Sequence, residues 1–188
     1  TFNEKHNLNV MGDFSYQTFL NTSLSGSGTG FISDVTETYD LSAASTPGIP
    51  GSGYSKSVLM SYLGRVNYAF NDKYLATVSF RADGSSVFSE GDKWGYYPSA
   101  ALAWRISSED FFSNVRFISD LKLRAGWGNT GSQAIGAYTT LNQLNSLKAV
   151  FDGNLYTAYA PGTRMPWPLL WETTEQQDIG VDFGILNN

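Results

Sequence analysis

Hydrophobic and polar residues alternate along four stretches of the chain, and every charged residue within them falls on the same side. The stretches are Met60–Phe70, Tyr74–Asp83, Tyr96–Ser107 and Leu121–Gly128. Because successive side chains of a β-strand point to opposite faces, this period of two predicts strands. One face carries only uncharged residues, among them Tyr62, Val66, Val78, Phe80, Leu102, Trp104, Leu123 and Trp127. The opposite face carries Arg65, Arg81, Asp83, Arg105, Lys122 and Arg124 among small residues.

Two more segments alternate in the same way, His6 to about Gln17 and roughly Trp171–Ile185. The sequence therefore predicts an all-β fold, an antiparallel up-and-down meander of about six long strands. Thr18–Ser57, rich in Ser, Gly, Thr and Pro, is predicted to be a loop, and so is the proline-containing stretch Asn129–Leu170. Asn71-Asp72-Lys73 is predicted to form a tight hairpin turn.

The remaining connections complete a pattern of alternating length. Residues 107–112 are predicted to form a helical turn with Ser107 or Ser108 as its N-cap. Long or middle-sized connections then alternate with shorter ones, as in transmembrane barrels, which have short periplasmic turns and longer outer loops. Glu175 and Gln177 share the parity of the apolar face, so we expect the last strand to project beyond the hydrocarbon layer.

A soluble sheet with one dry face shows the same alternation, but the composition favours a membrane barrel. The 188 residues are 15% charged and 15% aromatic, with 19 Gly and 11 Tyr, whereas about 25% charged is usual for a soluble domain. No run approaches the roughly 18 apolar residues of a spanning helix. The net charge of −5 argues against a nucleic-acid partner. The first and last residues suggest a piece of a longer polypeptide.

Few residues are suited to catalysis or metal binding. His6 is the only histidine and there is no cysteine, which excludes a His cluster and thiolate chemistry. The acidic pairs Glu90/Asp92, Glu109/Asp110 and Glu172/Glu175 are predicted to be solvated or to cap turns. The glycines of residues 126–131 lack the lysine and the helix of a phosphate loop. We therefore expect no enzyme, no metal and no cofactor.

Ligand-binding candidates lie on the charged face and in the loops. Arg65, Arg81, Asp83, Arg105, Lys122 and Arg124 would bind an anionic ligand, pair with acids of an internal plug, or form a solvated polar wall. Tyr159 and Trp167 are candidates for stacking on a ligand such as a sugar. Trp94 and Trp171 are predicted to anchor at a lipid interface.

Several phrases resemble the late barrel region of SusC/RagA-type TonB-linked outer-membrane proteins. They are FNDKYLATVSFRADGSSVF (70–88), WGYYPSAALAWRISSEDFF (94–112), LKLRAGWGNTGSQAIGAY (121–138) and LLWETTEQQDIGVDFGILNN (169–188). No single phrase is decisive, but their order and spacing together are specific over residues 58–188. Residues 1–57 match only in general character, and Val87 stands where the family often has a basic residue.

The resemblance implies a 22-stranded barrel plugged by an N-terminal domain, of which residues 1–188 are an open part without the plug, the TonB box or the terminal strand. It implies TonB-powered import of glycans, peptides or other large nutrients across a bacterial outer membrane. The implied partners are a SusD-like lipoprotein lid, TonB and outer-membrane lipid. A soluble secreted β-sandwich that binds carbohydrate is the alternative, and it predicts a second layer over the apolar face. An extracellular glycosidase, a third possibility, needs two carboxylates about 5 to 9.5 Å apart.

Overall fold

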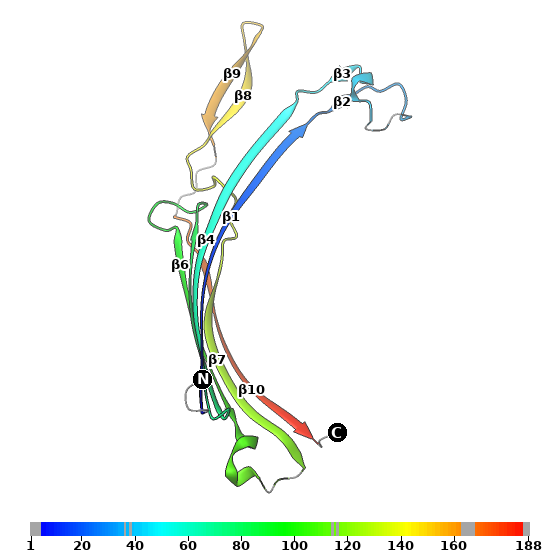
Figure 1. The fold of residues 1–188 in the computed structure, drawn as a ribbon. Coiled ribbons are helices and arrows are strands. Elements are labelled where there is room, and N and C mark those ends of the chain that lie inside the picture. Colours follow the sequence, from blue (N-terminus) through cyan, green and yellow to red (C-terminus); the bar gives the residue numbers. More distant parts are fainter. Residues whose placement is uncertain are drawn as a thin grey trace.

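The computed structural model describes residues 5–35, 37, 39–113, 115, 117–162 and 168–185. Its main feature is one antiparallel sheet of six strands in the order β1-β4-β5-β6-β7-β10. The strands are β1 (His6–Ser25), β4 (Gly51–Phe70), β5 (Tyr74–Ser85), β6 (Trp94–Arg105), β7 (Ile118–Ser132) and β10 (Glu172–Ile185). Figure 1 shows them as a single curved layer. The predicted all-β meander of six long strands is confirmed.

The first hairpin is longer than the sequence pattern suggested. β1 and β4 pair without interruption from His6 opposite Phe70 to Ser25 opposite Gly51. The prediction that Thr18–Ser57 is a loop is therefore wrong at both of its ends. These ends are rich in Ser, Thr and Gly, and their apolar residues Phe19, Leu20 and Leu24 do not all lie on one face, yet backbone hydrogen bonds extend the ladder. Only the tip is a connection, with β2 (Gly28–Thr29), β3 (Thr46–Pro47) and the 3₁₀ turn η1 (Leu41–Ala43).

The stretch Asn129–Leu170 also contains strands that the sequence pattern did not reveal. β7 continues to Ser132, and a separate hairpin follows, formed by β8 (Leu144–Phe151) and β9 (Asn154–Pro161). This hairpin projects beyond the sheet near the long β1–β4 ribbon (Figure 1). Apolar residues lie on both of its faces, so no period of two marks it in the sequence.

The two connections at the opposite end of the sheet differ in length, because the turn at residues 71–73 is tight whereas residues 106–117 form a longer connection than residues 86–93 at the other end. The predicted alternation of long and shorter connections is therefore wrong at the connection after β6, which contains two 3₁₀ turns. Asn71 and Asp72 have φ angles of 56° and 54°, a left-handed conformation that Asn and Asp tolerate, so the predicted tight turn is confirmed. After β6 come two 3₁₀ turns, η2 (Ile106–Ser108) and η3 (Asp110–Phe112).

The N-caps of these 3₁₀ turns are not the predicted serines. They are Arg105 and Glu109, and neither makes a side-chain capping bond. The Ser107 hydroxyl donates to Asp120 at 2.8 Å instead, because Ser107 lies inside η2 and faces β7. No helix among the described residues is long and apolar enough to cross a membrane.

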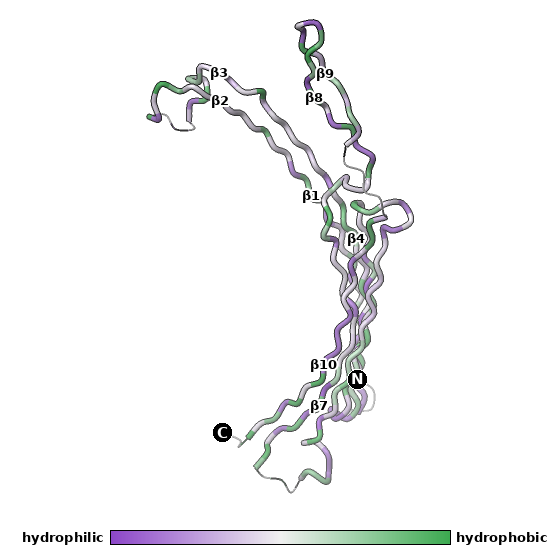
Figure 2. Tube along the Cα trace, turned by 180° about the vertical axis from the view of Figure 1, so that it is seen from behind, coloured by the Kyte–Doolittle hydropathy of each residue, from purple (hydrophilic) through white to green (hydrophobic). Residues whose placement is uncertain are grey.

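The register places the apolar side chains on one face across all six strands. Val66 lies opposite both Val10 and Val78, and Leu102 lies opposite Ala76 and Ala125. We call this surface the apolar face and the opposite one, which carries the charged residues, the polar face. Figure 2 shows the alternation of hydrophilic and hydrophobic residues along the strands.

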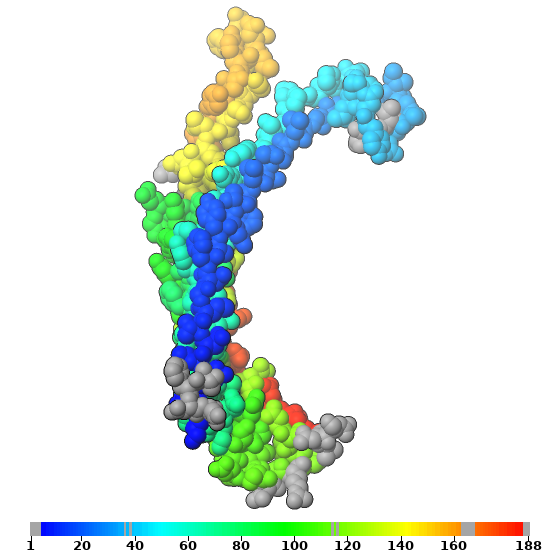
Figure 3. All heavy atoms as spheres, in the orientation of Figure 1, coloured from blue at the N-terminus to red at the C-terminus, as the bar shows by residue number. Residues whose placement is uncertain are grey.

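Nothing in the described part of the chain covers the apolar face. Val10 is 68% exposed and Leu102 is 65% exposed, and Figure 3 shows a thin curved wall rather than two layers. The only buried apolar residues of the described chain are Val87, Phe88 and Tyr97. A β-sandwich would bury the apolar face in a dry core, so the structure does not favour that alternative.

Candidate functional site

Two rows of aromatic rings border the apolar face. The row at the end with the tight turns, here called the turn end, runs across four strands through His6, Phe70, Tyr74 and Trp104. Successive ring centroids in it are 4.9, 6.4 and 6.4 Å apart. At the other end, here called the loop end, Phe14 lies 5.1 Å from Tyr62, which lies 6.1 Å from Trp94. Transmembrane barrels carry such aromatic girdles at both membrane interfaces.

The spacing of the two rows fits a bilayer. Tyr62 precedes Phe70 by eight residues in β4, and Trp94 precedes Trp104 by ten in β6. At ~3.4 Å per residue and a strand tilt of about 40°, the rows are about 21 to 26 Å apart along the membrane normal. The apolar band of a transmembrane barrel is about 25 Å tall.

The apolar stretch also shifts steadily from strand to strand. In β1 it begins near Leu8 and runs toward the loop end, whereas in β10 it begins at Ile179 and runs toward the turn end. Leu8 and Ile179 belong to the same register row, connected through Tyr68, Ala76, Leu102 and Ala125. The stretch is therefore displaced by about six residues across the sheet. Strands ~4.8 Å apart and tilted by about 40° should displace a horizontal band by about six residues over five steps.

This displacement explains the polar residues on the apolar side of β10. Glu175 and Gln177 lie beyond Ile179 toward the loop end, as expected for a strand that projects past the hydrocarbon band. Trp127 Nε1 donates to Glu175 Oε1 at 2.9 Å, and Gln177 Nε2 donates to the same oxygen at 3.1 Å. These three residues mark the polar border of the band on this side of the sheet.

At the turn end, one carboxylate forms hydrogen bonds both to the aromatic row and to a residue of the tight turn. Glu109, between η2 and η3, accepts hydrogen bonds from the Tyr74 hydroxyl at 2.7 Å, Trp104 Nε1 at 3.0 Å and Lys73 Nζ at 3.0 Å. Hydrogen bonds from Tyr74, Trp104 and Lys73, in that order, lower the pKa of Glu109 to about 2. The hydrogen bond to Glu109 raises the pKa of Lys73. The sequence analysis missed this role and treated Glu109 as a turn acid.

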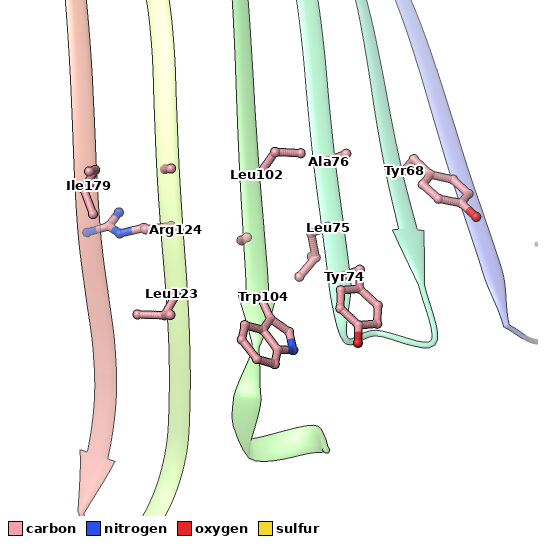
Figure 4. Close-up of a pocket in the computed structure, with 11 residues that line it drawn as sticks. Tyr68, Tyr74, Leu75, Ala76, Leu102, Trp104, Leu123, Arg124 and Ile179 are labelled. Atoms are coloured by element: carbon pink, nitrogen blue, oxygen red, sulfur yellow. The ribbon is translucent and has the colours of Figure 1, made fainter. Parts of the chain in front are cut away.

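Beside this row, the apolar face is hollowed. A shallow groove of ≈ 590 Å³ lies over Ala76 and Ala125, between the larger side chains of Tyr74, Trp104 and Ile179. Figure 4 shows Tyr74, Ala76, Trp104 and Ile179 on neighbouring strands that border the groove. The alternation of small and large residues gives an uneven apolar surface.

On the polar face, one group of charged residues lies toward the loop end. Arg81 Nε is 2.8 and 2.9 Å from the two carboxylate oxygens of Asp83, and Arg81 Nη2 donates to Ser61 Oγ at 3.3 Å. Asp83 is only 8% exposed, so the ion pair offsets the cost of burying its charge. The pair borders a hollow of ≈ 420 Å³, which Arg65 and Tyr97 also line.

The other predicted charged residues form a second group at the turn end. Arg105 Nε is 3.9 Å from Asp120, Lys122 Nζ is 3.3 Å from Asp182, and Arg124 Nε is 3.4 Å from Asp182. The structure thus divides the six predicted polar-face residues into two clusters. The residues that the sequence analysis missed are the partners Asp120 and Asp182, because pairing across strands depends on register.

Comparison with known proteins identifies the fold. No protein-family model matches the chain. It is 38% identical over 185 residues, 98% of its length, to "TonB-dependent receptor P26" of Formosa agariphila. It is 43% identical over 137 residues, 71% of its length, to "TonB-dependent receptor SusC" of Bacteroides thetaiotaomicron. In a solved structure of the RagAB peptide importer in the 'closed-closed' state, a chain matches all of it with a TM-score of 0.86 and 25% identity.

The chain belongs to the SusC/RagA-type TonB-dependent receptors. It spans 19% and 14% of the two curated relatives and 20% of the RagAB chain. This assignment explains the open sheet. The six strands match part of a larger β-barrel, in which further strands would pair with the two open edges and no second layer is needed. These relatives are named as receptors or importers.

Within this SusC/RagA-type wall, the aromatic residues of the loop end behave differently from one another. Trp94 lies on the apolar face beside Tyr62, where its predicted role as a lipid anchor stays a prediction. Trp171, the other predicted lipid anchor, packs against other residues of the protein. Its ring lies 4.9 Å from that of the buried Phe88 and 5.8 Å from that of Tyr97, and its Nε1 donates to the Lys93 carbonyl at 3.1 Å. Trp171 differs from Trp94 because its ring covers Phe88 and Tyr97, two of the three buried apolar residues of the described chain.

The two loop candidates have separate outcomes. Tyr159 lies in strand β9 opposite Ser146, not in a loop, and its side chain is exposed. Trp167 lies outside the described residues. No group of three or more His, Cys, Asp or Glu residues suited to a metal ion occurs in the described ranges.

Proposed function

We propose that this chain forms part of the barrel wall of an outer-membrane importer that takes up large nutrients, glycans or peptides, through energy supplied by TonB. The observation that carries the proposal is the oblique apolar band between two aromatic rows, which matches tilted strands in a bilayer. The apolar face then contacts outer-membrane lipid, and the polar face lines the lumen. The chain has no enzymatic role in this proposal.

The receptor names of the relatives support import, and the orientation follows from the connections. The tight turn and the Glu109 turn lie on the periplasmic side, and the long ribbons lie outside. A plug domain, a TonB box and the terminal strand are supplied by the rest of the receptor in this proposal. Arg65, Arg81, Asp83, Arg105, Lys122 and Arg124 then face the nutrient path.

The projecting ribbons are proposed to meet a SusD-like lipoprotein lid. Leu24 and Val150, on ribbons of only two strands, and Ile49, in the connection at the tip of the first ribbon, are more than two-thirds exposed. Such ribbons are marginally stable in water alone, and exposed apolar side chains in this number indicate a protein interface. Tyr159 and Trp167 are the proposed contacts of this region with the nutrient.

Chemical labelling of cells that express the full-length receptor tests the orientation. Ser146→Cys lies in the projecting hairpin, and Ser113→Cys lies after the Glu109 turn; both serines are exposed. A maleimide–polyethylene glycol reagent too large for porins should label Ser146→Cys in intact cells. It should label Ser113→Cys only after the outer membrane is permeabilised. Equal labelling of both variants in intact cells would contradict a transmembrane wall.

A further inference from the structure

Arg65 differs from the other four cations of the polar face. Arg81, Arg105, Lys122 and Arg124 each lie within 4.0 Å of a carboxylate. Arg65 has no such partner within the part of the chain that the structure describes, and its side chain is exposed. A guanidinium carries five fixed donors suited to a planar carboxylate, so Arg65 keeps that capacity for a ligand.

The neighbours of Arg65 leave room for a ligand. In the register, Arg65 lies opposite Ser79, Ser79 lies opposite Ser99, and Ser99 lies opposite Gly128. The Ser79 and Ser99 hydroxyls are 2.6 Å apart and bond to each other. On the side toward β5, β6 and β7 this row carries only small side chains, so Arg65 borders the ≈ 420 Å³ hollow there, while Met11 lies opposite Arg65 in β1.

Other polar atoms of the same hollow also lack partners. Among the described residues, the Tyr97 hydroxyl and Asn129 Oδ1 are buried and make no hydrogen bond. Tyr97 is 5% exposed, and both residues line the hollow. Buried polar atoms are normally paired, so these two indicate a partner that the described chain does not supply.

The charge of the hollow limits the kind of ligand. Arg65 and Arg81 contribute two positive charges, and Asp83, held by Arg81, contributes one negative charge. One net positive charge suits a single carboxylate. A doubly charged phosphate would exceed this positive charge by one and would be repelled by the Asp83 carboxylate more strongly than a single carboxylate.

We propose that the hollow binds a carboxylate of the nutrient, with Arg65 as its direct partner and Arg81 held in place beside it by Asp83. This inference rests on the proposed function, because it takes the polar face as the nutrient path. The carboxylate has two possible sources, an acidic or C-terminal group of a peptide or a uronate of a glycan.

Arginine-specific labelling of the purified full-length receptor tests this site. Phenylglyoxal should modify Arg65 in the absence of ligand, and mass spectrometry of the digested protein measures the extent. The probes are a decapeptide as free acid or amide, and hexagalacturonate or its methyl ester. One acid should slow modification of Arg65 several-fold, its neutral counterpart should not, and Arg105 should be unaffected by either. The acid that protects identifies the source.

Two labelling results would overturn the proposal. If phenylglyoxal fails to modify Arg65 in the absence of ligand, another part of the receptor already covers this side chain. Equal rates with acid and neutral probes show that no carboxylate binds there. Both results leave import untouched, whereas failure of the proposed function would appear as loss of the membrane topology described above.

Substitution of Arg65 provides a second test, in which ligand binding is measured. Arg65→Gln should weaken binding of the protecting acid about tenfold and leave its neutral counterpart unchanged, while Arg65→Lys should retain part of the preference. Lys5→Gln, which removes a charge from an exposed residue at the turn end, is the matched control. A fall in melting temperature without any change in acid preference would assign Arg65 a structural role and contradict the site.

Discussion

At the scale of single residues, Glu109 shows how a few polar contacts fix the turn end of the wall. Its carboxylate joins three donors from the turn after β4, the start of β5 and the end of β6. Tyr74 and Trp104 thereby satisfy their polar atoms while their rings remain on the apolar face. Buried or interfacial Tyr and Trp need such partners, so the contact fixes both the turn and the aromatic row.

Glu109→Gln in the full-length receptor tests this contact through pH. The ionised form is favoured in the folded state, because the pKa falls from an ordinary value of 4.5 to about 2. The stabilisation is therefore complete above about pH 4.5 and is lost as the pH falls toward 2. The variant should melt a few degrees lower than the wild type at pH 7, and the difference should shrink near pH 2. A difference that stays constant over this range would contradict an ionised anchor.

The charged residues show what sequence could predict at this scale. Parity alone placed Arg65, Arg81 and Asp83 on one face, and the Arg81–Asp83 pair follows from their spacing of two within one strand. The pairing of Lys122 and Arg124 with Asp182 needs the register of β7 with β10, which the sequence does not show. The burial of Tyr97 likewise depends on Trp171, 74 positions away.

At the scale of elements, the predictable strands are those whose two faces meet different surroundings. In β5 and β6 all charged residues lie on one side and the large aromatic residues Tyr74, Phe80 and Trp104 on the other, because one face is apolar and the other polar. The projecting ends of β1 and β4 and the β8–β9 hairpin have no such contrast between their faces, so these strands were predicted as loops. These strands depend on backbone hydrogen bonds and on the surfaces that cover them, and neither produces an alternation of apolar and polar residues in the sequence.

Two glycines on strands of the wall should respond oppositely to alanine. Gly64 lies opposite Gly12 on the apolar face, and a Cβ there would have open space. Gly64→Ala should stabilise the receptor by about 0.5–1 kcal/mol, because glycine costs conformational entropy in a strand. The thermal unfolding midpoint of the receptor in detergent measures the change, and a clear loss of stability would show that the open space is occupied.

Gly131→Ala should destabilise the receptor, in contrast to Gly64→Ala. A Cβ at Gly131 would collide with the ring and hydroxyl of Tyr97, which is buried under Trp171. The variant should lose about 1–3 kcal/mol, as expected for an overpacked site. Tyr97→Ala should remove most of this additional cost in the double variant. Strictly additive effects would show that the two residues do not meet.

At the scale of the whole molecule, the tilt of the strands relates the sequence to the membrane. The apolar stretch moves by about six residues between β1 and β10, so only the rows near Leu8 and Ile179 are apolar across all six strands. A horizontal bilayer crosses the tilted strands at a different residue in each one. This is why Glu175 and Gln177 fit the same wall as Val10 and Val66.

The open edges of the sheet lead to a prediction for the segment by itself. Among the described residues, β1 pairs only with β4 and β10 only with β7, so each strand presents an unpaired edge. β1 is 20 residues long and β10 is 14 residues long, and long flat edges recruit further strands. Residues 1–188 refolded in detergent should therefore form β-rich multimers or aggregates. Light scattering coupled to size-exclusion chromatography measures their mass. A monomer that unfolds cooperatively would instead show that the six strands close or protect their own edges.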